Sequence, residues 1–279
     1  MRNSLPRRAR TPLTLMATAT VAAALLATTV APANAGNATS PQGPKPTVVL
    51  VHGAFADSTS WNGVVKKLKR DGYPVVAAAN PLRGLSSDAA YLKELLAGID
   101  GPVVLAGHSY GGAVITNAAR GADNVKALVY VAAFMPDEGE SALDLAQKFP
   151  GSSLGEALYS VPVTLPDGSQ GQDFYIEHAK FQHQFAHDVE ENTAELMAVT
   201  QRPVTGAALG EPSSAPAWKT IPSWALVATG DRNIPRKTQN YMAERANART
   251  VEVRASHAVS VSHPDEVSRI IREAARSAR

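Results

Sequence analysis

The sequence contains no cysteine among its 279 residues. Disulfide bonds, cysteine nucleophiles and cysteine metal ligands are therefore excluded. The chain also lacks internal repeats at the periods of solenoid or propeller proteins, so a repeat architecture is not expected. A chain of this length can bury one large core, and such a core needs no disulfides even outside the cell.

The first 35 residues contain no acidic side chain, and residues 13–30 carry no charge at all. Four arginines precede this apolar run, and Ala33-Asn34-Ala35 behind it offers the small residues that a signal peptidase reads. We therefore predict a signal peptide over residues 1–35 and a secreted (extracellular) protein, exported by the Sec or the twin-arginine route. An uncleaved membrane anchor is the alternative, since the run approaches spanning length, but its threonines and the cleavage site disfavour it.

The charge balance gives no sign of a polyanionic partner. The chain has 27 Lys and Arg residues and 25 Asp and Glu residues, and removal of the four leader arginines leaves 23 against 25, a formal charge of −2. Neither a nucleic-acid partner nor a stable membrane partner is expected of the mature chain. The sequence carries no signal for an oligomeric state.

After a flexible lead-in at residues 36–46, short apolar runs alternate with amphipathic segments. Helical spacing marks Trp61–Arg70, Gly111–Arg120 and Pro264–Ala275 among these segments. The alternation predicts an α/β domain over residues 47–279, with a mainly parallel sheet of about six strands flanked by helices. The expected strands are short runs suited to burial on both faces, and they are Thr47–Val51, Val75–Ala79, Val103–Ala106, Val125–Ala133, Trp224–Thr229 and a weaker Thr250–Val253.

The alternation is interrupted at about residues 135–222, where the sequence is rich in proline and shows no convincing buried strand. Helical pieces are expected near Ser141–Lys148, Asp173–Asp188 and Asn192–Gln201. We interpret this stretch as an inserted helical cap rather than an independent domain. Its aromatic residues are candidates for walling an apolar pocket, although most are expected to pack the cap onto the core; they are Phe149, Tyr159, Phe174, Tyr175, Phe181, Phe185 and Trp218.

The strongest chemical motif is Gly107-His108-Ser109-Tyr110-Gly111-Gly112, which lies between an expected strand and an apolar helix. A nucleophile elbow requires that context. The turn must be sharp so that the serine hydroxyl stands clear of the backbone, and glycines two residues before and after the serine avoid clashes. The following helix points its N-terminal amides at a developing anion. Ser109 is therefore the predicted nucleophile.

A second motif, His52-Gly53-Ala54-Phe55, directly follows the first expected strand. The tetrahedral intermediate of acyl transfer carries an oxyanion, which needs two preorganised N–H donors. One donor is expected to be the amide of Tyr110, and the other should come from this loop, with Ala54 preferred and Phe55 as the alternative. We interpret His52 as a residue that fixes the loop rather than as a base.

Asp231 and His257 each follow an expected strand, where the active sites of parallel sheets assemble. His257 is the predicted base that takes the Ser109 proton, and Asp231 is predicted to orient it. The order Ser109, Asp231, His257 is the one expected of this type of triad. Two alternatives are kept: Asp231 caps a helix that begins near Pro235, or His263 replaces His257, although its place before a proline suggests the start of a helix.

Two further histidines, His183 and His187, lie four residues apart in the expected cap. This spacing suits a metal ion, but no HExxH pattern accompanies it, so a solvated helix face is preferred. No metal and no other cofactor is predicted.

With these residues in place, the sequence resembles α/β-hydrolases with a short cap. It is similar in particular to small bacterial serine esterases and to the group of plant methyl esterases and hydroxynitrile lyases. The likeness runs from about residue 47 to about residue 271 and implies a cofactor-free hydrolase of small to medium apolar esters. Because no room is left before residue 47 for two further strands, a six-stranded sheet is expected. The similar blocks are VLVHGAFADSTSW, AGHSYGG, FMPDEGES, QRP, PSWALVATGDRNIP and ASHAVSVSHPDEV.

Two positions narrow the chemistry that the resemblance implies. Ser109 stands where epoxide hydrolases and haloalkane dehalogenases carry an aspartate, and Ala258 stands where plant-type hydroxynitrile lyases usually carry a lysine. The expected function is therefore hydrolysis of a small-molecule ester through an acyl-enzyme. Two alternatives stay open, namely cofactor-free perhydrolysis, as in haloperoxidase-like relatives, and a non-catalytic hydrolase fold that binds a ligand.

Overall fold

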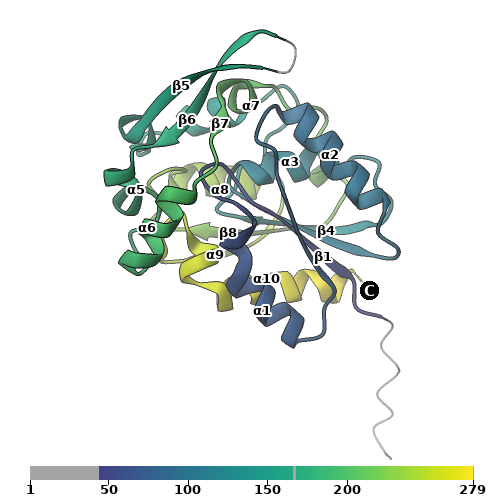
Figure 1. The fold of residues 1–279 in the computed structure, drawn as a ribbon. Helices are drawn as coiled ribbons and strands as arrows, with labels where there is room; N and C mark the ends of the chain where they lie inside the picture. Colours follow the sequence, from purple (N-terminus) through teal and green to yellow (C-terminus); the bar gives the residue numbers. More distant parts are fainter. Residues whose placement is uncertain (1–43, 166–167, 279) are drawn as a thin grey trace, which may run out of the picture. The chain divides into compact units, whose positions relative to one another are not determined.

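A parallel sheet of six strands forms the centre of the described part of the chain, which is residues 44–165 and 168–278 of a computed structural model (Figure 1). The strands are β1 (Thr47–Val51), β2 (Val75–Ala78), β3 (Val103–His108), β4 (Val125–Val131), β8 (Ser223–Ala228) and β9 (Arg249–Val253). They lie in the order β2-β1-β3-β4-β8-β9, and each neighbouring pair is parallel. The predicted fold class and the six-stranded sheet are thus confirmed.

The predicted signal peptide, residues 1–35, lies outside the described residues, as does the lead-in up to residue 43. Both assignments therefore stay predictions. Within the described part of the chain, no helix combines the length and apolar character that crossing a membrane requires.

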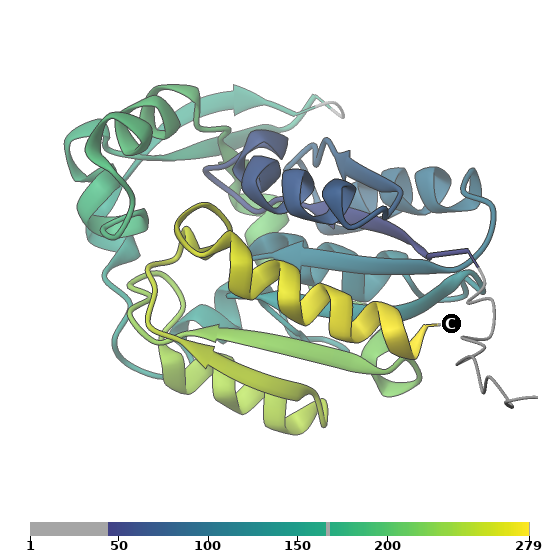
Figure 2. The same cartoon turned by 90° about the horizontal axis from the view of Figure 1, so that it is seen from below.

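The strands divide the core into two layers, because successive side chains point to opposite faces of a sheet. Val49 and Leu105 are buried with helices α2, α3 and α8 on one face. Val48 and Val104 are buried on the other face with α1 and α10, which lie next to each other in Figure 2. The helices are α1 (Asn62–Arg70), α2 (Leu85–Ala97), α3 (Tyr110–Ala118), α8 (Arg236–Arg245) and α10 (Pro264–Ser277), with a short turn η1 (Ser58–Trp61) before α1 and a short helix α9 (Val259–Ser262) before α10.

Between β4 and β8 the chain leaves the sheet and builds an insertion. Figures 1 and 2 show the insertion beyond the carboxyl ends of the sheet strands. Its elements are α4 (Ala142–Gln147), η2 (Leu154–Ala157), β5 (Leu158–Thr164), β6 (Gln170–Ile176), α5 (His178–Phe185), α6 (Glu191–Thr200), β7 (Val204–Thr205), α7 (Gly206–Gly210) and η3 (Ala217–Lys219).

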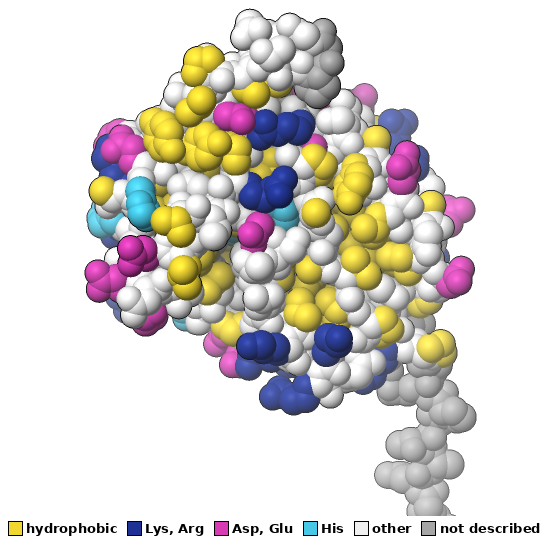
Figure 3. Space-filling view, in the orientation of Figure 1, with side chains coloured by type: hydrophobic (Ala, Val, Ile, Leu, Met, Phe, Trp, Pro, Cys, Tyr) yellow, Lys and Arg dark blue, Asp and Glu magenta, His cyan; other side chains and the backbone are white. Residues whose placement is uncertain are grey.

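The insertion contains an antiparallel sheet, β5-β6-β7, that the sequence did not lead us to expect. Residues 173–176, expected in a helix, form the end of β6. Most residues of β5 are exposed, including Tyr159, which stacks on Tyr175 across the strands. Figure 3 shows hydrophobic side chains near these strands, on a face where acidic and basic side chains are interspersed. An exposed strand carries no buried apolar run, so the pattern used to find the other strands is absent.

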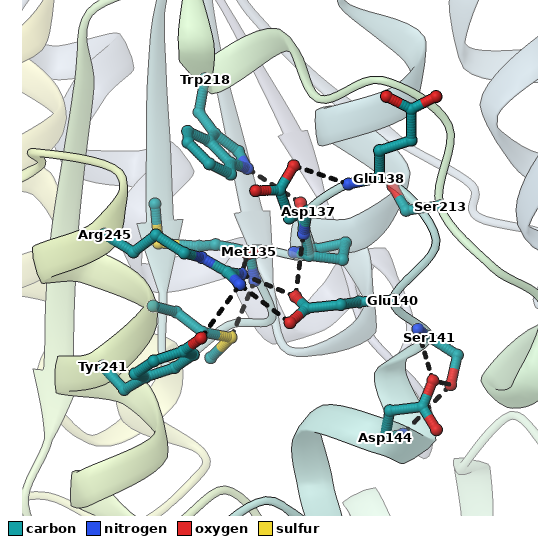
Figure 4. Close-up of polar contacts among 12 residues, drawn as sticks. Met135, Asp137, Glu138, Glu140, Ser141, Asp144, Ser213, Trp218, Tyr241 and Arg245 are labelled. Carbon is teal, nitrogen blue, oxygen red and sulfur yellow. Dashed lines mark hydrogen bonds and ion pairs between the residues drawn. The ribbon is translucent and has the colours of Figure 1, made fainter.

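The chain enters the insertion through residues 135–141, which an ion pair attaches to α8 (Figure 4). The Arg245 guanidinium donates from Nη1 to Glu140 Oε1 at 2.8 Å and from Nη2 to Oε2 at 2.7 Å. Nη2 also donates to the Met135 carbonyl at 2.9 Å. A reciprocal capping box between Ser141 and Asp144 then starts α4. Residues 135–141 are therefore bonded to α8 of the main domain before α4 begins.

We expect Glu140→Ala to lower the free energy of unfolding by about 1–3 kcal/mol, because Arg245 loses two charge-assisted hydrogen bonds in a partly buried setting. Glu138→Ala is a matched control, since Glu138 is exposed in the same turn and Figure 4 shows its carboxylate pointing away from Arg245. Urea unfolding of the wild type and both variants measures the difference. Equal loss of stability in the two variants would contradict the role of the ion pair.

Candidate active site

Ser109 lies at the sharp turn between β3 and α3. Its backbone has φ 53° and ψ −126°, a left-handed conformation that costs free energy for any residue other than glycine. The end of β4 holds the turn, since the Ser109 amide donates to the Val131 carbonyl at 3.3 Å and the Phe134 amide donates to the Ser109 carbonyl at 3.1 Å. A Cβ at Gly107 would lie 2.5 Å from the Gly111 carbonyl oxygen. The strand–turn–helix context expected from the sequence is thus present.

Asp231 and His257 follow β8 and β9, which are neighbours in the sheet, and their side chains are in direct contact. His257 Nδ1 donates to Asp231 Oδ2 at 2.7 Å, and the two side chains are 1% and 0% exposed. With its proton on Nδ1, the imidazole presents Nε2 as an acceptor. Asp231 does not cap α8, because Pro235 is the N-cap residue of that helix and no side chain caps it.

The Asp231 carboxylate is also held by three other donors. Oδ1 accepts from the amides of Asn233 at 2.7 Å and Ile234 at 3.0 Å. Oδ2 accepts from the Gln239 side chain at 2.9 Å. Gln239, buried on α8, also accepts from the Ala228 amide at 3.1 Å, which ties the carboxylate to the end of β8. Sequence reasoning missed Gln239, because one polar residue in a helix gives no local sign that it points inward.

The structure brings Ser109 to the same edge of the sheet but does not join it to His257. The ring of His108, the residue before Ser109, lies 4.7 Å from the His257 ring between centroids. His108 Nε2 also donates to the His257 carbonyl at 2.8 Å. Among the described residues, no hydrogen bond connects Ser109 Oγ to His257. Such bonds are often long in enzymes without substrate and shorten when it binds.

His52 fixes the loop that follows β1. Its Nδ1 donates to the Gly53 carbonyl at 2.9 Å, and its Nε2 accepts from the Asn80 amide at 3.0 Å. The Asn80 side chain donates in turn to the His52 carbonyl at 2.9 Å. Burial lowers the pKa of His52. Because both ring nitrogens have partners, these contacts agree with a loop-fixing role rather than a role as base.

Ala54 and Tyr110, the preferred oxyanion donors, both line the cavity that reaches Ser109. Tyr110 is the first residue of α3, where amides lack intrahelical acceptors. Within the described residues, the Ala54 amide has no backbone acceptor, whereas the Phe55 amide donates to the Arg202 carbonyl at 3.0 Å. Phe55 would therefore have to break a hydrogen bond to serve as an oxyanion donor.

A cavity of about 440 Å³ opens onto Ser109, and the residues that line it include no charged side chain. Its size and apolar character suit a small molecule. The insertion provides much of the wall, but Phe149 alone of the aromatic candidates contributes. Phe181 and Phe185 are instead buried in the core. The lining residues from the insertion are Ala142, Leu143, Ala146, Gln147, Phe149, Pro150, Gly151, Ser152, Leu154, Gly155, Leu158 and Leu209.

The remaining histidines lie outside this arrangement. His263 is the N-cap residue of α10, and its Nδ1 lies 3.5 Å from Asp188 Oδ2, so it sits at the start of a helix as expected. His187 is exposed, and its Nε2 donates to the Gly230 carbonyl at 3.0 Å. The described residues include no group of three or more His, Asp or Glu side chains arranged to hold a metal ion.

The chain belongs to the alpha/beta hydrolase family, whose model matches residues 48–270. It is 26% identical over 254 residues to alpha/beta hydrolase nvfD of Aspergillus novofumigatus, a match that covers 83% of this chain and 97% of that protein. It is 25% identical over 215 residues to Methylesterase 8 of Arabidopsis thaliana, covering 70% and 76% of the two chains. The solved structure of polyneuridine aldehyde esterase superposes with a TM-score of 0.70 at 20% identity, covering 82% of this chain and 98% of that one. The resemblance inferred from the sequence is confirmed.

Stability is expected to fall in acid because of His108. Burial, and then the neighbouring His257, hold the pKa of His108 well below 6.5. The unfolded chain therefore gains a proton below about pH 6.5 that the folded chain does not, which removes about 1.4 kcal/mol of stability per pH unit until the folded pKa is reached. Urea unfolding at about pH 7 and about pH 5 should show a smaller acid loss for His108→Gln than for wild type. Parallel losses in the two proteins would contradict this prediction.

The Tyr110 side chain is hydrogen-bonded to a buried carboxyl group. Its hydroxyl donates to Asp88 Oδ2 at 3.0 Å, and the Arg83 amide donates to Asp88 Oδ1 at 3.2 Å. Burial raises the pKa of Asp88 because a charge is costly to place there. The hydrogen bond to Asp88 thus fixes the side chain of Tyr110, the first residue of α3.

We expect Asp88→Ala to destabilise the fold by about 1–3 kcal/mol, because it leaves the buried Tyr110 hydroxyl without an acceptor. Asp88→Asn should recover part of this loss, since its amide oxygen still accepts the Tyr110 hydroxyl while its NH2 group faces the Arg83 amide and cannot accept from it. Thermal or urea unfolding of both variants provides the measurement. Equal destabilisation by alanine and asparagine would rule out this explanation.

Proposed function

We propose that this chain is a serine hydrolase that cleaves carboxylic esters of small to medium apolar molecules, with Ser109, His257 and Asp231 as its catalytic triad. The main support is the buried Asp231–His257 contact beside a strained serine turn that opens into an uncharged cavity. The names of two relatives, a methylesterase and a polyneuridine aldehyde esterase, support ester bonds as the target.

In the first step, Ser109 Oγ attacks the ester carbonyl carbon while His257 Nε2 takes the hydroxyl proton. Asp231 stabilises the imidazolium that forms and keeps the remaining proton on Nδ1. The amides of Ala54 and Tyr110 donate to the oxyanion of the tetrahedral intermediate, where one such donor contributes about 3–4 kcal/mol. As the intermediate collapses, the imidazolium protonates the departing alcohol, and the acyl group stays on Ser109.

In the second step, a water molecule attacks the acyl-enzyme, and His257 Nε2 accepts its proton. The second intermediate collapses, the imidazolium returns the proton to Ser109 Oγ, and a carboxylic acid leaves. The absence of charged side chains from the cavity lining supports an uncharged substrate, because a charged group would lose its hydration without gaining a partner.

Ser109→Ala is expected to lower kcat for p-nitrophenyl butyrate by at least about a thousandfold, because the nucleophile is lost while the rest of the site remains. Ser86→Ala, at an exposed position on α2, is the matched control and should retain wild-type activity. A fluorophosphonate probe should label wild type, and peptide mass mapping should place the label on Ser109. Wild-type activity in Ser109→Ala, or a label elsewhere, would overturn the proposed function.

A further inference from the structure

A short segment of the insertion, residues 185–188 at the C-terminal end of α5, contacts both loops that carry Asp231 and His257. The contacts fall on the residues either side of His257 and on the residue before Asp231. All three are hydrogen bonds, from the Ala258 amide to the Phe185 carbonyl at 3.0 Å, from the Ser256 amide to Asp188 Oδ2 at 2.9 Å, and from His187 Nε2 to the Gly230 carbonyl at 3.0 Å.

Asp188 is the charged member of this segment, and its side chain is 21% exposed. Burial alone would raise its pKa, but hydrogen bonds from Ser256 and Ser262, with His263 nearby, hold the pKa of Asp188 below its ordinary value. The side chain is therefore a carboxylate at neutral pH, and a carboxylate is a stronger acceptor for the Ser256 amide than a neutral group.

The loop that carries His257 is also held from the side of the sheet. The His257 carbonyl accepts from His108 Nε2 at 2.8 Å, and its imidazole donates to Asp231. The backbone of residues 256–258 is thus bonded to other elements at the amides of Ser256 and Ala258 and at the carbonyl of His257. Asp188 of the insertion and His108 of β3 each supply a side-chain partner to this loop. Removing Asp188 leaves the insertion bonded to the loop through the Phe185 carbonyl.

We propose that Asp188 and His187 are positioning residues, through which the insertion holds His257 and Asp231 in line with Ser109. The inference rests on the proposed function. Neither residue is among those that line the cavity, so their loss should affect the chemical step more than substrate binding. A displacement of about 1 Å in a catalytic group can lower the rate about a hundredfold.

The test compares Asp188→Ala, Asp188→Asn and the control Glu195→Ala, which removes an exposed carboxylate from α6 of the same insertion. Steady-state rates with p-nitrophenyl butyrate are divided by the concentration of active sites, which is measured by titration with a fluorophosphonate. Only folded, reactive enzyme is then counted. We expect Asp188→Ala to lower kcat per site about 10- to 100-fold with KM within about twofold. Asp188→Asn should recover most of the loss, because its amide oxygen accepts from Ser256.

His187→Ala provides a second, independent variant at an exposed position, and it removes the hydrogen bond to Gly230 alone. It should lower kcat per site several-fold without changing KM, and it decides the matter if Asp188→Ala does not fold. Values of kcat per site equal to the Glu195→Ala control, or a change confined to KM, would overturn the inference. The proposed function fails separately, if Ser109→Ala stays active or the fluorophosphonate label lies on another residue.

Discussion

The hydrogen bond between Asp231 and His257 is the contact on which the rest of the site depends. A carboxylate with no exposed surface is tolerated only when donors surround it, because its desolvation costs several kcal/mol. The neighbouring amides, Gln239 and the imidazole supply those donors. The strands β8 and β9, the turn after β8 and helix α8 must therefore be in place together. Because Asp231 Oδ2 accepts a hydrogen bond from the imidazole, the neutral ring carries its proton on Nδ1, and Nε2 is left able to accept a proton.

The parallel sheet explains why residues far apart in sequence meet at this point. Strands β3, β8 and β9 all end at one edge, with β4 between β3 and β8, so each following residue emerges on the same side of the molecule. At the end of β3 the chain must turn at once into α3, and the left-handed conformation of Ser109 is the cost of that turn. The end of β4 and the residues just after it offset the strain by bonding the Ser109 amide and carbonyl.

The features predicted from the sequence are those with a local signal. Buried strands are continuous apolar runs, so the six sheet strands were found, with boundaries that shift by one or two residues. Ser109, Asp231 and His257 follow three of those strands, and parallel pairing implies that their ends lie together. The strand β5 was missed because it is largely exposed, and β6 because it carries one buried residue and therefore no buried apolar run. Gln239, His108 and Asp188 were missed because their partners lie 8, 149 and 68 residues away, and no local pattern marks such contacts.

The insertion combines two tasks in different parts of its length. Residues between 142 and 158, together with Leu209, form the insertion's part of the cavity wall, whereas residues 185–188 contact the loops of Asp231 and His257. The wall is uncharged and mostly apolar, so exchanging its apolar side chains changes the volume and shape offered to a substrate without breaking a polar contact. The bracing contacts are directional hydrogen bonds to backbone groups, and they tolerate little displacement. Since the two parts share no residue, side chains of the cavity wall can change while the hydrogen bonds to the loops of Asp231 and His257, the proposed base, stay in place.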